Sequence, residues 1–128
     1  MSIVITFGTF DVFHIGHLNI LQRAKKEGTK LVVGVSSDAL NFQKKKRNPI
    51  YNQDARMAII SALDCVDDVF LEESLELKAQ YIQQHNASLL VMGDDWAGKF
   101  DNMPCGVKYL QRTPSVSTTQ IIEIIKLL

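Results

Sequence analysis

Apolar residues recur along this chain in two patterns, short continuous runs and longer repeats with helical spacing. The runs are rich in β-branched and aromatic residues and predict five buried strands, at residues 3–7, 30–36, 66–71, 88–93 and 106–110. Apolar residues at helical spacing predict four helices, one from near Ile15 to before Gly28 and others over 54–64, 74–86 and 117–128. Strands that alternate with helices predict an α/β fold. The specific prediction is a Rossmann-like, doubly wound, mainly parallel five-stranded sheet with helices on both faces.

The stretch 36–53 has neither pattern and is expected to be irregular. It contains four consecutive basic residues, 44–47, and a proline at position 49. In open parallel sheets, ligands bind beyond the carboxyl ends of the strands. Segments 8–17, 36–47, 93–100 and 111–118 each follow a predicted strand, so we expect all four to meet at one crevice.

The composition is that of one ordinary globular domain. The 128 residues are 46% hydrophobic and 22% charged, and 14 basic residues balance 14 acidic ones. This zero net charge gives no electrostatic support for nucleic-acid binding, and no apolar run approaches the roughly 20 residues of a membrane span. The N-terminus lacks a secretory leader pattern, so we expect a cytoplasmic protein in which Cys65 and Cys105 are free thiols.

Residues 8–17, GTFDVFHIGH, place two histidines at a predicted strand-to-helix turn. His14 and His17 are three positions apart and share one helix face, where free backbone N–H groups favour a phosphate. Two imidazoles there can stabilise the charge of a phosphoryl transition state, and Gly16 leaves room for the ligand. Two other readings stay open: the histidines cap the helix or pair with Asp11, or they form part of a metal site that lacks an obvious third ligand.

A second anion-binding segment is predicted near the C-terminal end, in the residues RTPSVSTTQI of 112–121. The Arg112 guanidinium can bind phosphate through two hydrogen bonds, and Ser117 and Thr118 add hydroxyls and helix N-terminal amides. Ser117 is also a natural N-cap for the last helix. The stretch GDDWAGKF, 93–100, is either a strand–loop junction with a buried tryptophan or part of a site, and the basic run 44–47 is either a solvated face or an anion site.

These motifs together carry a family resemblance. TFDVFHIGH resembles the signature of the nucleotidylyltransferase superfamily, whose H-x-G-H element grips a nucleoside triphosphate. The segment 112–121 resembles the superfamily's second signature, R-T-x-G-I-S-T-T-x-I, with Pro114-Ser115-Val116 in place of x-Gly-Ile. GDDWAGKF and DALNFQKKK, 38–46, are similar to the glycerol-3-phosphate cytidylyltransferases, and the match covers almost the whole chain except for 47–53 and 101–106.

The resemblance implies the transfer of a cytidylyl group from CTP to sn-glycerol 3-phosphate, giving CDP-glycerol and pyrophosphate for teichoic-acid or capsule-type polymer synthesis. It implies Mg²⁺ that enters with CTP, no dedicated metal ligand from the protein, and a homodimer. A cytidylyltransferase for another phosphorylated alcohol, such as phosphoethanolamine, phosphocholine or a sugar-alcohol phosphate, and a non-catalytic nucleotide-binding protein are the alternatives.

The resemblance also assigns roles to particular residues. The catalytic group is His14, His17, Arg112 and Lys44. The CTP-binding group is Thr9, Phe10, Asp11, Gly16, Lys46, Asp94, Arg112, Thr113, Ser117, Thr118 and Thr119. The acceptor-binding group is Lys44, Lys78 and Arg56. Losing the family's glycine at Ser115 is expected to alter the backbone approach to the pyrophosphate, because serine resists positive φ.

Overall fold

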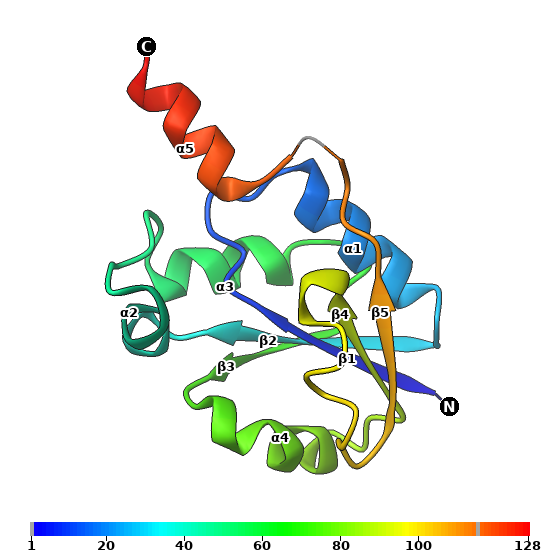
Figure 1. Ribbon diagram of the computed structural model, residues 1–128. Coiled ribbons are helices and arrows are strands. Elements are labelled where there is room, and N and C mark those ends of the chain that lie inside the picture. The colour runs from blue at the N-terminus through cyan, green and yellow to red at the C-terminus, as the bar shows by residue number, and fades with distance from the viewer. Residues whose placement is uncertain (1, 115) are drawn as a thin grey trace.

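The computed structural model describes residues 2–114 and 116–128, and within these the chain forms one parallel β-sheet (Figure 1). Its strands are β1 (Ile3–Gly8), β2 (Lys30–Ser36), β3 (Asp68–Glu72), β4 (Leu89–Gly93) and β5 (Gly106–Leu110). They are ordered β3-β2-β1-β4-β5, and all the pairings are parallel. The Rossmann-like prediction is therefore confirmed, and the sheet is wholly rather than mainly parallel.

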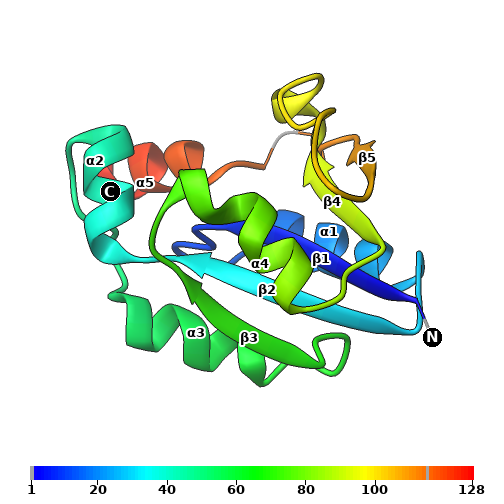
Figure 2. The ribbon, with the colours of Figure 1, turned by 90° about the horizontal axis from the view of Figure 1, so that it is seen from below.

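Helices cover both faces of this sheet, as Figures 1 and 2 show. On one face lie α1 (Ile15–Lys25) and α3 (Gln53–Ser61), which place Leu21 and Ile60 in an apolar cluster with the strand residues. On the other face lies α4 (Lys78–Gln84), after the short 3₁₀ turn η1 (Leu75–Leu77), and its Ile82 joins a second cluster. Because both faces are covered, β1 and β2 are almost continuously apolar instead of alternating.

The remaining helical elements gather near the carboxyl ends of the strands. They are α2 (Asp38–Lys45), the 3₁₀ turn η2 (Asp94–Trp96) and α5 (Thr118–Lys126). From β1 the next strands are added on one side of the sheet, as β2 and β3, and the last two on the other side, as β4 and β5. Open α/β sheets bind ligands at this switch point, between β1 and β4.

The prediction that 36–53 is irregular is wrong, since α2 occupies its first part. Ser37 caps α2 by accepting a hydrogen bond from the Leu40 N–H, and Lys46 ends it with a left-handed φ of 60°. The buried side chains of α2 are only Leu40 and Asn41, so its sequence lacks the apolar repeat that predicts a helix. The sequence signal that could have predicted α2 was Ser37, a residue type that commonly caps helices.

Two further expectations can be compared with the described residues. Cys65 and Cys105 are free thiols, as expected. Among residues 2–114 and 116–128, we find no helix that combines the length and apolar character of a membrane span.

Candidate active site

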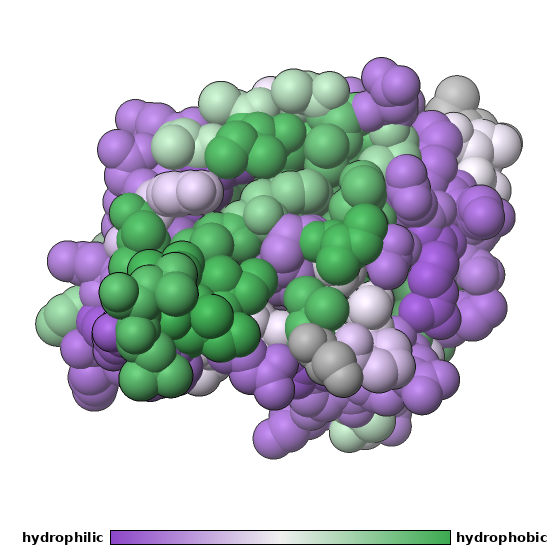
Figure 3. Space-filling model, turned by 90° about the horizontal axis from the view of Figure 1, so that it is seen from above, coloured by the Kyte–Doolittle hydropathy of each residue, from purple (hydrophilic) through white to green (hydrophobic). Residues whose placement is uncertain are grey.

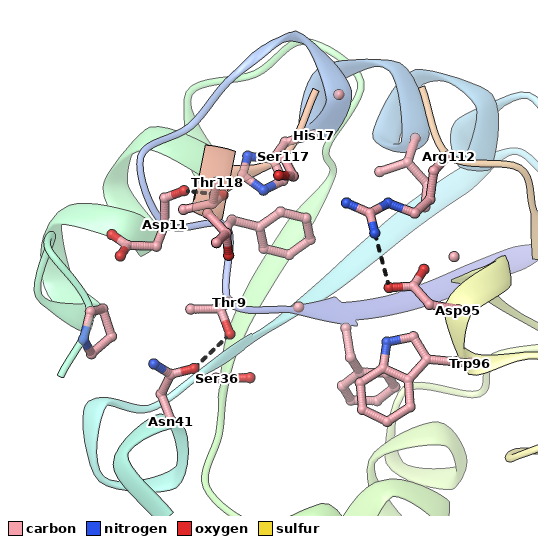
Figure 4. Close-up of a pocket in the computed structure, with 18 of the residues that line it drawn as sticks. Thr9, Asp11, His17, Ser36, Asn41, Asp95, Trp96, Arg112, Ser117 and Thr118 are labelled. Carbon is pink, nitrogen blue, oxygen red and sulfur yellow. Dashed lines mark hydrogen bonds and ion pairs between the residues drawn. The ribbon is translucent and has the colours of Figure 1, made fainter. Parts of the chain in front are cut away.

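A cavity of about 590 Å³ lies at the carboxyl edge of the sheet, and side chains from all four predicted segments line it (Figure 4). The structure therefore brings together residues as far apart in the chain as Asp11 and Thr118, which are separated by 107 positions. The predicted site residues that line this cavity are Thr9, Phe10, Asp11, His14, Gly16, His17, Lys44, Lys78, Arg112, Thr113, Ser117, Thr118 and Thr119.

The two histidines form the N-terminal cap of α1. His14 is the N-cap residue, and its Nδ1 accepts a hydrogen bond from the Gly16 N–H at 3.0 Å, while Nδ1 of His17 accepts from the His14 N–H at 3.2 Å. The rings stack with centroids 3.8 Å apart. Because Nδ1 accepts in both rings, the proton of each neutral imidazole is on Nε2. Each ring thus keeps one N–H donor that the cap does not use.

Both histidines are held in the uncharged form. Burial is the main cause that lowers the pKa of His17 to about 3, and the neighbouring His14 lowers it further, against a smaller opposing effect of Asp11. Burial and then the Arg112 guanidinium lower the pKa of His14. This end of the cavity therefore presents neutral donors beside a helix N-terminus.

The turn before α1 is strained and is tied to two distant segments. Phe10 and Val12 have left-handed φ values of 55° and 48°, which are costly for a bulky and a β-branched residue. The Asp11 carboxylate accepts hydrogen bonds from the Ile50 and Tyr51 N–H groups at 2.7 and 2.8 Å. In this geometry Asp11 holds the segment at Ile50 and Tyr51 against the turn, and its hydrogen bonds go to backbone amides and not to a histidine.

The α5 end of the cavity combines a capped helix with the guanidinium of Arg112, which is ion-paired with Asp95. Ser117 caps α5 by accepting from the Gln120 N–H, and the Thr118 hydroxyl donates to the Asp11 carbonyl. Arg112 is half exposed and lies 3.6 Å from an Asp95 carboxylate oxygen (Figure 4). The expectation about backbone at Ser115 falls outside the described residues.

The opposite end of the cavity holds two lysines and a carboxylate. Lys78 Nζ lies 2.7 Å from Glu72 Oε2, and both side chains are buried. Lys44 Nζ is 3.4 Å from the Ser36 hydroxyl. Burial is the main cause that lowers the pKa of each lysine, and the Glu72 charge opposes it in both.

Arg56 was expected at the acceptor, but in this structure it does not reach the cavity. It is fully buried, and its three nitrogens donate to the carbonyls of Tyr51, Thr9 and Ser36 and to the Asp38 carboxylate. These contacts join α3 to the ends of β1 and β2. Its position therefore indicates a structural tie between the walls of the site.

Lys46 and Asp94 were expected to bind CTP, and neither side chain lines the cavity. Lys46 is exposed at the end of α2, whereas its neighbours Lys45 and Arg47 do line the cavity. Asp94 is also exposed, and the next residue, Asp95, lines the cavity instead. In both places the predicted motif lies at the cavity, but the side chain that lines the cavity belongs to an adjacent residue.

Sequence reasoning also missed several lining residues that follow or end strands. Ser36 and Glu72 are the last residues of β2 and β3, and Asn41 accepts from the Thr9 hydroxyl at 2.9 Å. Polar residues at the ends of apolar strands were the available signal. Among the described residues, no cluster of three or more His, Cys, Asp or Glu side chains is placed to hold a metal ion.

Comparisons with known proteins bear on this geometry. Residues 5–124 match the cytidylyltransferase-like family model. A glycerol-3-phosphate cytidylyltransferase of Bacillus spizizenii is 46% identical over 123 residues, which cover 94% of this chain and 95% of that protein. The Staphylococcus aureus enzyme of that name is 37% identical over 94% of this chain and 92% of its own length. A lipopolysaccharide core biosynthesis protein from Thermoplasma volcanium superposes with a TM-score of 0.71, at 26% identity, over 88% of this chain and 97% of its own.

Proposed function

The chain belongs to the cytidylyltransferase-like family, and we propose that it is a nucleotidyltransferase that converts CTP and sn-glycerol 3-phosphate into CDP-glycerol and pyrophosphate. Relatives at 37–46% identity over nearly the full chain carry the name of this activity. CDP-glycerol in turn suits the synthesis of a glycerol-phosphate polymer of the teichoic-acid or capsule type.

The observation that carries the proposal is the single cavity with two different anion-binding ends. One end has two helix N-termini, the neutral histidines and Arg112, which suit a triphosphate. The other end has two lysines, the buried Lys78 and the half-buried Lys44, which suit the dianion of a phosphate monoester. A reaction between two phosphate compounds needs such a continuous site.

The chemistry needs no covalent enzyme intermediate. A phosphate monoester has a second pKa of about 6, so the acceptor oxygen is already nucleophilic at neutral pH. That oxygen forms a bond to the α-phosphorus of CTP, the bond from the α-phosphorus to the bridging oxygen breaks, and pyrophosphate leaves with that electron pair. The chain therefore has to align two anions and stabilise the charge that spreads over the α-phosphate oxygens.

The histidines would supply that stabilisation through hydrogen bonds rather than charge. With Nδ1 used in the α1 cap, Nε2–H of each ring is the remaining donor for an α-phosphate oxygen. Fixed, uncharged donors at the start of α1 need little rearrangement during the reaction. Arg112 and the N-terminus of α5 would hold the β- and γ-phosphates, and Lys44 and Lys78 would hold the acceptor phosphate.

Mg²⁺ would enter with CTP, bound largely by phosphate oxygens and water as this ion prefers. The Asp11 carboxylate, the acidic group of the histidine turn, already accepts hydrogen bonds from backbone amides.

The protein would act as a homodimer. Figure 3 shows hydrophobic residues gathered over the end of α5, where Ile124, Ile125 and Leu127 are exposed. Exposed apolar patches are typical of interaction surfaces, which supports self-association. Light scattering coupled to size-exclusion chromatography measures the mass directly.

Pyrophosphate release tests the function. The protein is incubated with CTP, Mg²⁺ and sn-glycerol 3-phosphate, and in parallel with phosphoethanolamine, phosphocholine and a sugar-alcohol phosphate. We expect the highest kcat/KM with sn-glycerol 3-phosphate and much lower values when ATP replaces CTP. A higher value with another acceptor would reassign the substrate, and CTP binding without turnover on any acceptor would indicate a non-catalytic nucleotide-binding protein.

A further inference from the structure

A buried carboxylate lies behind the two lysines of the cavity. Glu72 is the last residue of β3, at the edge of the sheet, and its side chain is 1% exposed. A carboxylate in such a place is costly unless hydrogen-bonded ionic or polar partners surround it. Its partners therefore indicate why it is there.

Both carboxylate oxygens of Glu72 are used. Oε2 accepts from Lys78 Nζ at 2.7 Å, and Oε1 accepts from the Ser36 hydroxyl at 3.2 Å. The Ser36 oxygen in turn lies 3.4 Å from Lys44 Nζ. Residues on β2, β3, α2 and α4 thus form one chain of polar contacts, and every member of it lines the cavity.

The surroundings of Lys78 explain why a counter-charge is needed. Its Nζ is 3.8 Å from the centroid of the Phe7 ring, and the ring of Phe100 is also within reach at 5.1 Å. The Lys78 side chain is only 3% exposed. Without a carboxylate, a lysine in this apolar setting loses its proton readily.

We propose that Glu72 is a positioning residue of the acceptor site: its carboxylate holds Lys78 directly and Lys44 through Ser36, and so fixes two charged ammonium groups at the spacing that receives the acceptor phosphate. The assignment rests on the proposed function for the identity of that phosphate. Each ammonium has three donors, so contact with Glu72 or Ser36 leaves others for the ligand.

The pH dependence of the two lysines follows from the same contacts. Burial lowers the pKa of Lys44 and of Lys78, and Glu72 raises both. The cations Lys45, Lys78 and Arg56 also lower the pKa of Lys44. Glu72 is thus the carboxylate that opposes these effects, and removing its charge should move loss of acceptor binding to lower pH.

The main test is Glu72→Gln, which keeps the shape and removes the charge. We expect the KM for sn-glycerol 3-phosphate to rise about tenfold or more, because the charge that strengthens the hydrogen bond to Lys78 is lost. The KM for CTP should change less than twofold, and the alkaline limb of kcat/KM for the acceptor should move to lower pH. The matched control is Glu73→Gln, because Glu73 is exposed and lies outside the cavity.

Two further variants keep the test decisive if Glu72→Gln does not fold. Glu72→Asp keeps the charge but shortens the reach, so it should raise the acceptor KM while the alkaline limb moves less. Ser36→Ala removes both hydrogen bonds of the Ser36 hydroxyl, to Glu72 and to Lys44, but leaves the Glu72–Lys78 pair in place, so it should raise the acceptor KM by a smaller factor. Unchanged acceptor KM in folded Glu72→Gln, or in both fallback variants, would overturn the proposal, as would equal effects on CTP and acceptor.

A measurement without turnover separates this inference from the proposed function. Nuclear magnetic resonance of lysine labelled at Cε follows the titration of Lys78 in the parent protein and in Glu72→Gln or Glu72→Asp. A lower pKa of Lys78 in Glu72→Gln supports the role of Glu72, and an unchanged one contradicts it. Lack of turnover in the parent protein contradicts the proposed function alone.

Discussion

The two ends of the cavity are built to attract anions in opposite ways. The histidine end relies on neutral groups: Nε2–H donors, helix N-termini and backbone amides, with Arg112 as a half-exposed cation. The lysine end relies on buried charge, with Lys78 paired to Glu72 behind it. At the first end the protein supplies dipoles already oriented by helix caps, and at the second it supplies cations balanced by a carboxylate.

This difference suits the two tasks of the site. A transition state whose charge is redistributed is best stabilised by fixed donors that need little reorganisation. A substrate that must only be captured and aligned is well served by full charges, which bind its dianion strongly. Changes at the histidine end should therefore alter turnover, and changes at the lysine end should alter acceptor affinity.

The largest expected effect comes from His17. In His17→Asn the amide oxygen can replace Nδ1 in the cap, but the Nε2–H donor is lost. We expect kcat to fall about 100- to 1,000-fold, as when one oxyanion donor is removed, with the melting temperature nearly unchanged. Steady-state kinetics and thermal unfolding measure the two quantities.

A companion variant separates catalysis from capping. His17→Gln can keep a donor near the Nε2 position while weakening the cap, so it should retain more kcat than His17→Asn and lose more stability. Near-normal turnover in His17→Asn would contradict this role of the histidine end, because the neutral donor would then have no part in the transition state.

Arg112 should give the next largest effect, on the KM for CTP. Arg112→Ala removes the planar guanidinium that can bind a phosphate through two hydrogen bonds, so we expect the KM for CTP to rise about tenfold or more. The acceptor KM should change much less. Arg112→Lys keeps the charge, so its KM for CTP should lie between those of the parent protein and Arg112→Ala. An equal rise in the KM values for CTP and for the acceptor would contradict the assignment of Arg112 to CTP.

Lys44 should give a smaller effect, on the KM for the acceptor at the lysine end of the cavity. Lys44→Ala should raise the KM for sn-glycerol 3-phosphate several-fold, up to about tenfold, and the KM for CTP less. Lys46→Ala is a control, since Lys46 is exposed outside the cavity. A larger effect of Lys46→Ala on CTP would restore Lys46 to the triphosphate site, and equal effects of Lys44→Ala on both substrates would exclude Lys44 from the acceptor site.

The sequence predicted the strands and the meeting of their carboxyl ends because these follow from local pattern. Apolar runs identify the strands, and parallel alternation places the following loops at one edge. The i, i+3 spacing likewise predicted that His14 and His17 share a face. Both expected roles of these residues are compatible, since capping uses Nδ1 and leaves Nε2 for the cavity.

Some predicted site residues lie outside the cavity because tertiary contacts decide the direction of a side chain. Arg56 is in a helix, and its partners Thr9 and Ser36 are 47 and 20 positions away, so no local pattern shows that its donors are occupied. The choice between Asp94 and Asp95 depends on the turn η2, which no periodicity specifies. The position of Glu72 at the end of an apolar strand indicates a residue at the carboxyl edge of the sheet, but nothing local indicates its buried partner Lys78.

The two ends should also differ in how they couple stability to pH. His17 has a pKa of about 3 in the folded protein and about 6.5 when unfolded, so the unfolded chain binds a proton first as pH falls. Its contribution to the free energy of unfolding is therefore complete above about pH 6.5 and is lost as pH falls toward 3. The lysines have lowered pKa values in the folded protein. They therefore change the free energy of unfolding only on the alkaline side, between that lowered pKa and the ordinary value of 10.5.

Urea unfolding from pH 7 to pH 4 should show a shallower loss of stability in His17→Asn than in the parent protein, whereas Lys44→Ala should leave this slope unchanged. Parallel slopes in all three proteins would show that the histidine is not held neutral by its surroundings.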